Sequence, residues 1–149
     1  MNTQELVDQM IKSKKLRNNH EIEKYEQSIE QLINHNKLEE LYLGFDDNTE
    51  DDEVMFGLVH AIESFCEEVG EEEYFFIFIN QIKMIYIESK EWIKLMTVRI
   101  LNDTESRNEF IKIFQKSKQE DKDFIINLMK DIELDNIEHL KDLTSKFTN

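Results

Sequence analysis

The stretch TEDDEVMFGLVHAIESFCEEV, Thr49–Val69, decides the fold of this chain. Its apolar residues recur at spacings of three and four, which is the period of one face of an α-helix. Because this face is wide, we expect the helix to be contacted on two sides and to lie near the centre of the fold. The apolar face consists of Val54, Met55, Leu58, Val59, Ile62, Phe65, Cys66 and Val69.

The rest of the 149-residue chain also favours helices. It has no proline and only three glycines, and these two residue types are the main signals of turns and strand ends. We therefore expect an all-α fold of about 8–9 helices, stacked as antiparallel hairpins in a helical-repeat-like or irregular bundle. The length fits a single domain covering residues 1–149. The expected helices are 3–15, 20–35, 37–44, 50–68, 72–87, 90–101, 104–116, 118–131 and 136–146.

Several of these helix starts are placed by capping chemistry, in which a short polar side chain accepts hydrogen bonds from the free N–H groups of the first turn. Three pairs resemble capping boxes, and two further residues are expected N-caps without the reciprocal partner. The pairs are Thr49 with Asp52, Ser117 with Glu120, and Asp135 with Glu138, and the single residues are Ser89 and Asp103.

The segment Tyr74–Ile87 is open to two interpretations. Aromatic and β-branched residues dominate it, so two short strands are one possibility. A helix is favoured, because Asn80–Lys83 lacks the chemistry of a hairpin turn and no partner strand is apparent. As a helix, the segment would be apolar nearly all round, and we expect it to be packed between other elements.

Charge is concentrated in the middle of the chain. Between Lys37 and Lys83 there are fourteen acidic residues and neither lysine nor arginine, whereas the net charge of the whole protein is −15. An evenly acidic protein would indicate solubility alone. Charge gathered in one central third indicates a surface for a partner, and we expect that partner to be basic.

Helix electrostatics accounts for part of this acidic block. Acids in the first turn of a helix are stabilised by about 0.3–1 kcal/mol each, which can explain Glu50, Asp51 and Asp52 and can extend to Glu53. Asp46 and Asp47 precede that turn, and the cluster from Glu67 to Glu73 lies near the far end of the expected helix, where carboxylates are unfavourable. Capping of the following helix, contact with a partner and a solvated face all remain open for this cluster. The candidate partner-binding residues are Asp46, Asp47, Asp51, Glu53, His60, Glu67, Glu68, Glu71, Glu72 and Glu73.

Known catalytic and cofactor patterns are missing from the sequence. There is no HExxH, GxSxG, CxxC or phosphate-binding glycine loop. A calcium loop starting at Asp46 or Asp47 fails, because position six would be Asp51 or Asp52 and position twelve Gly57 or Leu58. We therefore expect no enzymatic activity, metal or cofactor. Cys66 is expected to be a buried, inert thiol. Trp92 and the phenylalanines 45, 56, 65, 75, 76 and 78 are expected to be core residues, and partial exposure is an alternative for Trp92 because it lies at a helix start.

Partners and location are constrained by the same composition. The first residues lack the apolar core and cleavage site of a secretory signal, and no stretch is long and apolar enough to span a membrane. We expect a cytoplasmic protein. The acidic balance argues against direct binding of nucleic acid or of an anionic membrane, since phosphate contacts need lysine and arginine. The sequence does not indicate an oligomeric state.

Three stretches carry a resemblance to a known family. They are LRNNHEIEKYEQSIEQL (Leu16–Leu32), FDDNTEDDEVMFGLVHAIESF (Phe45–Phe65) and EWIKLMTVRILND (Glu91–Asp103). Over roughly residues 5–130 the chain resembles the immunity protein 30 family of bacterial polymorphic toxin systems. The resemblance implies a small all-helical cytoplasmic protein that binds and blocks a cognate toxin domain, without catalysis. The alternative is an acidic helical scaffold or adaptor, unrelated to toxins, that binds a basic protein or peptide.

Overall fold

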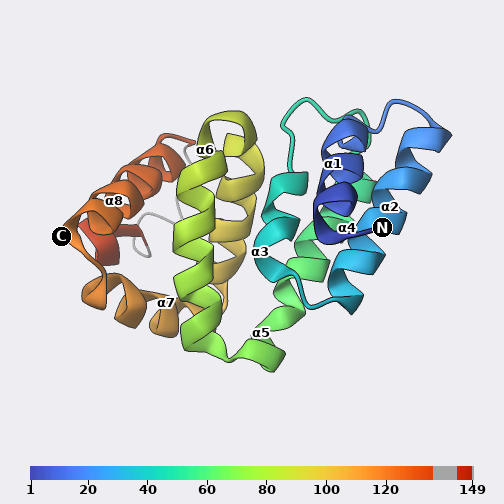
Figure 1. Ribbon diagram of the computed structural model, residues 1–149. Coiled ribbons are helices and arrows are strands. Elements are labelled where there is room, and N and C mark those ends of the chain that lie inside the picture. The colour runs from blue at the N-terminus through green and yellow to red at the C-terminus, as the bar shows by residue number, and fades with distance from the viewer. Residues whose placement is uncertain (136–143, 149) are drawn as a thin grey trace. The chain divides into compact units, whose positions relative to one another are not determined.

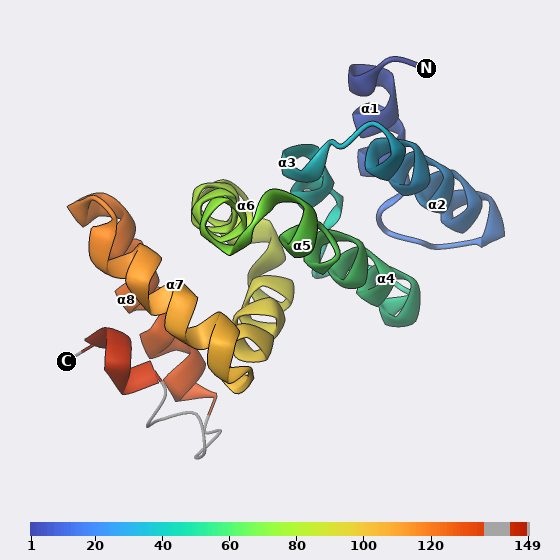
Figure 2. The same ribbon diagram turned by 90° about the horizontal axis from the view of Figure 1, so that it is seen from below.

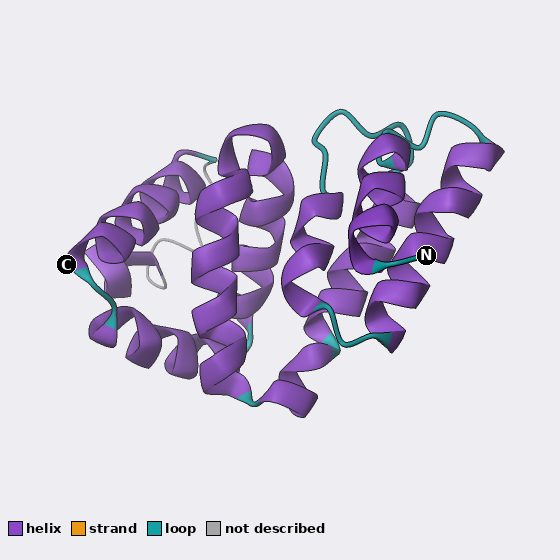
Figure 3. Ribbon diagram, in the orientation of Figure 1, coloured by secondary structure: helices purple, strands orange, loops and turns teal. Residues whose placement is uncertain are grey.

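The computed structural model describes residues 1–135 and 144–148. All regular elements in these residues are helical, as Figure 3 shows. The all-α prediction and the predicted number of helices are therefore confirmed. The elements are α1 (Thr3–Ser13), α2 (Asn19–Asn34), α3 (Leu38–Leu41), the short 3-10 helix η1 (Tyr42–Gly44), α4 (Asp52–Glu63), α5 (Phe65–Val69), α6 (Glu71–Asn102), α7 (Thr104–Lys116) and α8 (Gln119–Leu134), and residues 144–148 are also helical.

The chain forms two compact units, and each consists of two separate segments. Unit 1 comprises Met1–Val69 with Ile85–Trp92, and unit 2 comprises Gly70–Met84 with Ile93–Asn149. The long helix α6 therefore contributes to both units. The expectation of one domain stays a prediction.

The core of unit 1 begins with α1 and α2, which lie side by side in both views (Figures 1 and 2). Met10 of α1 and Tyr25 and Leu32 of α2 are fully buried, because the apolar stripes of the two helices face each other. The Tyr25 hydroxyl donates a hydrogen bond to the carbonyl oxygen of Gly44 over 3.0 Å. Burial raises the pKa of this hydroxyl, and the negative charge of Asp46 raises it further.

Helix α4 supplies the centre of unit 1, as its wide apolar face predicts. Met55, Leu58, Val59 and Ile62 are all fully buried. The predicted continuous helix 50–68 is wrong in one respect, because the chain ends α4 at Glu63 and begins α5 at Phe65. After this break the apolar face is only partly covered. Phe65 is buried, but Cys66 is only half-buried, which corrects the expected burial of its thiol, and Val69 is 37% exposed.

The ambiguous segment Tyr74–Ile87 is helical and forms the first half of α6. A kink at Ser89, where φ is −130° and ψ is 28°, separates it from the second half. Figure 1 shows the direction of the chain reversing there, so the predicted pair of helices meeting near Ser89 is essentially right. The expected burial on all sides is wrong, because Phe76, Met84 and Ile87 are 57%, 70% and 90% exposed.

An aromatic cluster forms the core of unit 2. The ring of Phe110 on α7 lies 5.6 Å from that of Phe75 and 5.8 Å from that of Phe78, both on α6, and 5.3 Å from that of Phe147. Helix α8 packs beside α7 in both views (Figures 1 and 2) and adds buried aliphatic side chains such as Ile125. The prediction that phenylalanines form the core is thus confirmed for residues 45, 65, 75 and 78 but wrong for Phe76, while Phe56 is half-buried.

The predicted caps have mixed outcomes. Asp103 is the N-cap of α7, since its carboxylate accepts from the Ser106 N–H over 2.9 Å, and this bond holds the pKa of Asp103 below its usual value. Ser117 is not an N-cap: its hydroxyl donates backward to the carbonyl of Ile113, which ends α7. Of the predicted helix 136–146 and the pair of Asp135 with Glu138, residues 136–143 lie outside the described residues.

Candidate protein-binding surface

Asp46, the first candidate binding residue, is buried within unit 1. Asp46 is 7% exposed. One of its carboxylate oxygens lies 3.4 Å from the Lys15 ammonium, and the other accepts a hydrogen bond from the Asn48 N–H over 2.8 Å. Its backbone carbonyl accepts from the indole N–H of Trp92 over 3.2 Å. Asp46 therefore uses its polar groups inside the protein. Its ion-pair partner Lys15 is not indicated by any pattern in the sequence.

Asp47 has a second internal task. Both of its carboxylate oxygens accept from the backbone N–H of Glu91 over 3.1 Å, and one also accepts from that of Trp92 over 3.4 Å. The backbone N–H of Asp47 donates to the carbonyl of Glu88 over 3.3 Å. Asp47 thus accepts from N–H groups just after the kink at Ser89, as an N-cap side chain does at the start of a helix. Trp92 is only 7% exposed, which confirms its expected place in the core and excludes the alternative of partial exposure.

Asp51 is the N-cap of α4. Its carboxylate accepts from the Val54 N–H over 3.0 Å, while Thr49, the residue predicted for this task, accepts from the Asp51 N–H. The N-cap therefore lies two residues after Thr49, and the predicted capping box is wrong, because the residue three positions after Asp51 is Val54, whose side chain cannot return a hydrogen bond. Asp52 and Glu53 follow in the first turn of α4, are exposed, and are stabilised by the helix dipole.

The side of α4 opposite its apolar face carries a polar stripe that is exposed to solvent. Glu53, Gly57, His60 and Ser64 lie at three- and four-residue spacings and are all exposed, and Glu67 on α5 is exposed as well. His60 packs edge-on against the ring of Phe56, with centroids 4.9 Å apart, and its Nδ1 lies 3.8 Å from a Glu63 carboxylate oxygen. We refer to Glu53, Gly57, His60, Ser64 and Glu67 as the α4 stripe.

The second acidic cluster is divided between two helix starts. Glu67 and Glu68 lie in the short helix α5, whereas Glu71, Glu72 and Glu73 form the first turn of α6, and all five are exposed. The expectation that these carboxylates lie near a helix C-terminus is wrong for Glu71–Glu73. Gly70, with φ of 89°, reverses the backbone just before them, so the dipole of α6 stabilises their charge.

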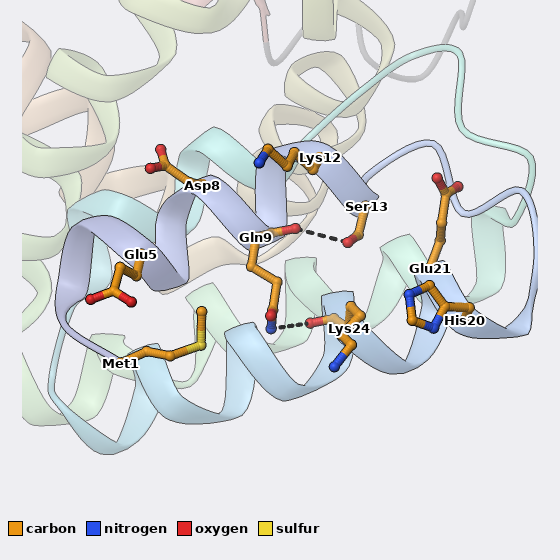
Figure 4. A pocket seen from close by; sticks show the side chains of 9 residues that line it. All are labelled: Met1, Glu5, Asp8, Gln9, Lys12, Ser13, His20, Glu21 and Lys24. Atoms are coloured by element: carbon orange, nitrogen blue, oxygen red, sulfur yellow. Dashed lines mark hydrogen bonds between the residues drawn. The ribbon is translucent and has the colours of Figure 1, made fainter.

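An open groove of about 500 Å³ lies between α1 and the start of α2 (Figure 4). Its polar groups mainly join the two helices: the Gln9 amide donates to the carbonyl of Lys24 over 3.2 Å and to the hydroxyl of Ser28 over 2.8 Å. Acidic and basic side chains both line the groove, so it does not have the single sign of charge that would favour a charged ligand. The lining residues are Met1, Glu5, Asp8, Gln9, Lys12, Ser13, His20, Glu21 and Lys24.

Metal-binding groups and membrane-spanning helices are both absent from the part of the chain that the structure describes. Within residues 1–135 and 144–148, no group of three or more His, Cys, Asp or Glu side chains has the arrangement to hold a metal ion. In the same part of the chain, no helix has both the length and the apolar character that crossing a membrane requires.

Comparison with known proteins gives one match. The family described as Immunity protein 30 matches residues 12–110, about two thirds of the chain. The matched region contains the whole α4 stripe, both acidic clusters and the contacts of Asp46 and Asp47 with Trp92. No curated protein and no solved structure matches the chain. From the extent of the family match, the chain belongs to the Immunity protein 30 family.

Proposed function

We propose that this immunity-family chain binds and inhibits a cognate polymorphic toxin domain in the cytoplasm, without catalysis of its own. The observation that carries the proposal is the exposed acidic α4 stripe inside the region that matches the family. The proposed toxin surface is basic, because the stripe and its surroundings offer carboxylates in a chain whose net charge is −15. A nuclease is the toxin class that fits this chemistry, since nucleases hold phosphates with lysine and arginine.

The proposed mechanism divides the candidate residues into two groups. The exposed residues Glu53, His60, Glu67 and Glu68, with Glu71–Glu73 in unit 2, contact the toxin. The other three, Asp46, Asp47 and Asp51, support this surface through their internal hydrogen bonds. Carboxylates facing a basic partner speed its diffusional encounter by 10–10³-fold and reject acidic competitors.

The test uses the toxin domain encoded next to this gene. Co-expression of the two proteins should restore growth, and a catalytically inactivated toxin domain should be retained by the tagged chain in a pull-down. Absence of both rescue and binding would contradict the proposal. If a basic protein without toxicity were retained instead, the scaffold alternative would replace it.

Charge-neutralising variants test the α4 stripe itself. Glu53→Gln combined with Glu67→Gln should weaken toxin binding by about tenfold or more, mainly by slowing association, and should reduce its dependence on salt. The matched control is Glu23→Gln with Glu26→Gln, which removes two exposed carboxylates from α2 of the same unit. Equal affinities of the two double variants would eliminate the stripe while leaving toxin binding intact.

A further inference from the structure

The first half of α6 presents an apolar surface to solvent within unit 2. Phe76 is 57% exposed and Met84 is 70% exposed. They lie eight residues apart with the half-buried Asn80 midway, and Glu72 precedes Phe76 by four residues, so all four share one side of the helix. Phe76 and Met84 are separated by about 12 Å at 1.5 Å per residue. We call Glu72, Phe76, Asn80 and Met84 the outer face of α6.

The opposite side of the same helix already provides the core of unit 2. Phe75, Phe78 and Ile82 are buried there, and the two phenylalanine rings pack against Phe110 of α7. The outer face is therefore not needed to complete this core. Aromatic and methionine side chains are enriched at the centres of protein–protein interfaces, where exposed carboxylates at the edge form a polar rim.

Charge indicates which kind of partner fits the outer face. Glu71, Glu72 and Glu73 are exposed at its N-terminal end. The nearest base on the same helix is Lys83, and its ammonium lies 2.5 Å from an Asp121 oxygen and 3.3 Å from a Glu120 oxygen. Hydrogen bonding to Asp121 raises the pKa of Lys83, so its positive charge is retained but already offset. The field beside Phe76 is consequently acidic.

This acidic field disfavours two other occupants. A second copy of the chain would also carry a net charge of −15, and the two copies would repel each other. An anionic membrane would repel the carboxylates of the first turn in the same way. A basic protein surface that contains an apolar pocket complements both features.

We propose that the outer face of α6 is a docking surface for the toxin, with Phe76 inserted into an apolar pocket bordered by lysine or arginine side chains that pair with Glu72 and Glu73. Met84 covers the far side of this pocket. The inference rests on the proposed function and extends the unit 2 contacts of Glu71–Glu73 to the apolar side chains beside them, as a region separate from the α4 stripe of unit 1. It also assigns the two regions different tasks: the stripe speeds encounter, whereas the outer face slows dissociation.

The test is a variant that combines Phe76→Ala with Met84→Ala. Alanine is the most favourable residue in a helix, so exposed positions accept it without loss of fold, which circular dichroism verifies. Binding of the inactivated toxin domain from the neighbouring gene is measured by calorimetry, and its rates by surface plasmon resonance. We expect the dissociation constant to rise at least tenfold, through faster dissociation, with an unchanged dependence on salt.

The matched control is Leu134→Ala, which removes another large apolar side chain of unit 2 that is 77% exposed, on α8. It should leave affinity unchanged. Glu72→Gln with Glu73→Gln should instead reduce the salt dependence, which separates the rim from the apolar centre. Hydrogen exchange should report protection of residues 72–84 on toxin binding.

Three outcomes would overturn the inference, and they are distinguishable. If the wild-type chain binds the toxin and the Phe76/Met84 variant binds it equally well, the docking role of the outer face is contradicted while the proposed function stands. If the wild-type chain does not bind the toxin, the proposed function and the docking role of the outer face are both contradicted. If sedimentation shows a wild-type dimer that this variant disrupts, the outer face pairs with a second copy instead.

Discussion

The indole N–H of Trp92 donates a hydrogen bond to the backbone carbonyl oxygen of Asp46 over 3.2 Å. The two residues are 46 positions apart, yet both belong to unit 1. Phe45 stacks near the same indole, with ring centroids 6.1 Å apart. The loop before α4 is thereby held against the start of the second half of α6, and the two segments depend on each other for stability.

Trp92→Phe should destabilise the protein by about 1–3 kcal/mol, because it removes part of a buried ring and one of the two donors to the Asp46 carbonyl, leaving only the Thr49 N–H at 3.2 Å. Urea unfolding followed by circular dichroism measures this loss. Fluorescence is unsuitable, since Trp92 is the single tryptophan of the chain. An unchanged unfolding midpoint would show that the hydrogen bond contributes nothing to stability.

Asp47→Ala should lower the free energy of unfolding by about 1–2 kcal/mol, because the N–H groups of Glu91 and Trp92 lose their acceptor. Glu26→Ala is the control: it removes an exposed acid from the middle of α2 in the same unit and should change stability by less than about 0.5 kcal/mol. Equal effects of the two changes in urea unfolding would mean that Asp47 does not act as a cap.

Gly44 and Gly57 should respond to alanine with opposite signs. A methyl group at Gly44 would come within 2.9 Å of Leu58 Cδ2 and of Met10 Sδ, so Gly44→Ala should destabilise by about 1–3 kcal/mol. At Gly57, inside α4, the added methyl meets open space, and the gain in helix propensity should stabilise the protein by about 0.5–1 kcal/mol. Thermal unfolding of both variants checks the signs, and a shift in the same direction for both would contradict the packing at Gly44.

Stability should depend on pH through Glu21. Two groups of Arg17 donate to its carboxylate, the guanidinium at 2.6 Å and the backbone N–H at 2.9 Å, and they lower the pKa of Glu21 to about 2. Because the folded-state pKa lies below the ordinary value of about 4.3, the stabilisation is present above that value. It is lost as the pH falls toward about 2.

Glu21→Gln should therefore flatten the dependence of the unfolding midpoint on pH between about 2 and 4.3. Glu26→Gln, an exposed acid of the same helix, should leave that dependence unchanged. Direct titration of the Glu21 carboxyl by carbon NMR provides the second measurement. A titration midpoint near 4.3 would rule out the proposed role of Arg17.

The helices were predictable because their signal is local. The three- and four-residue spacing in α4 predicts the burial of Met55, Leu58 and Ile62, and the structure confirms it. The capping prediction at Ser117 failed because a serine hydroxyl can also bond backward to a carbonyl, and the local sequence does not distinguish these options. The break between α4 and α5 after Glu63 was not predictable, because no proline or glycine lies there to mark a helix end.

The candidate surface was less predictable because its residues are sorted by distant contacts. Asp46 and Glu53 both belong to one acidic run, but Asp46 is buried and contacts Lys15, 31 positions before it, whereas Glu53 is exposed. No sequence spacing encodes that pair. Phe76 is similar: its helix is apolar on nearly all sides, so the sequence could not indicate which aromatic residue faces solvent.

The discontinuous make-up of the two units has a consequence for how this gene can be shortened or recombined. A product that stops after Val69 retains most of unit 1 but lacks Ile85–Trp92, including the N–H groups that Asp47 binds. A crossover within α6 would exchange parts of both units at once. Chimeras between relatives should therefore survive only when their junctions keep the loop at Asp46–Asp47 and the segment at Glu91–Trp92 from the same parent.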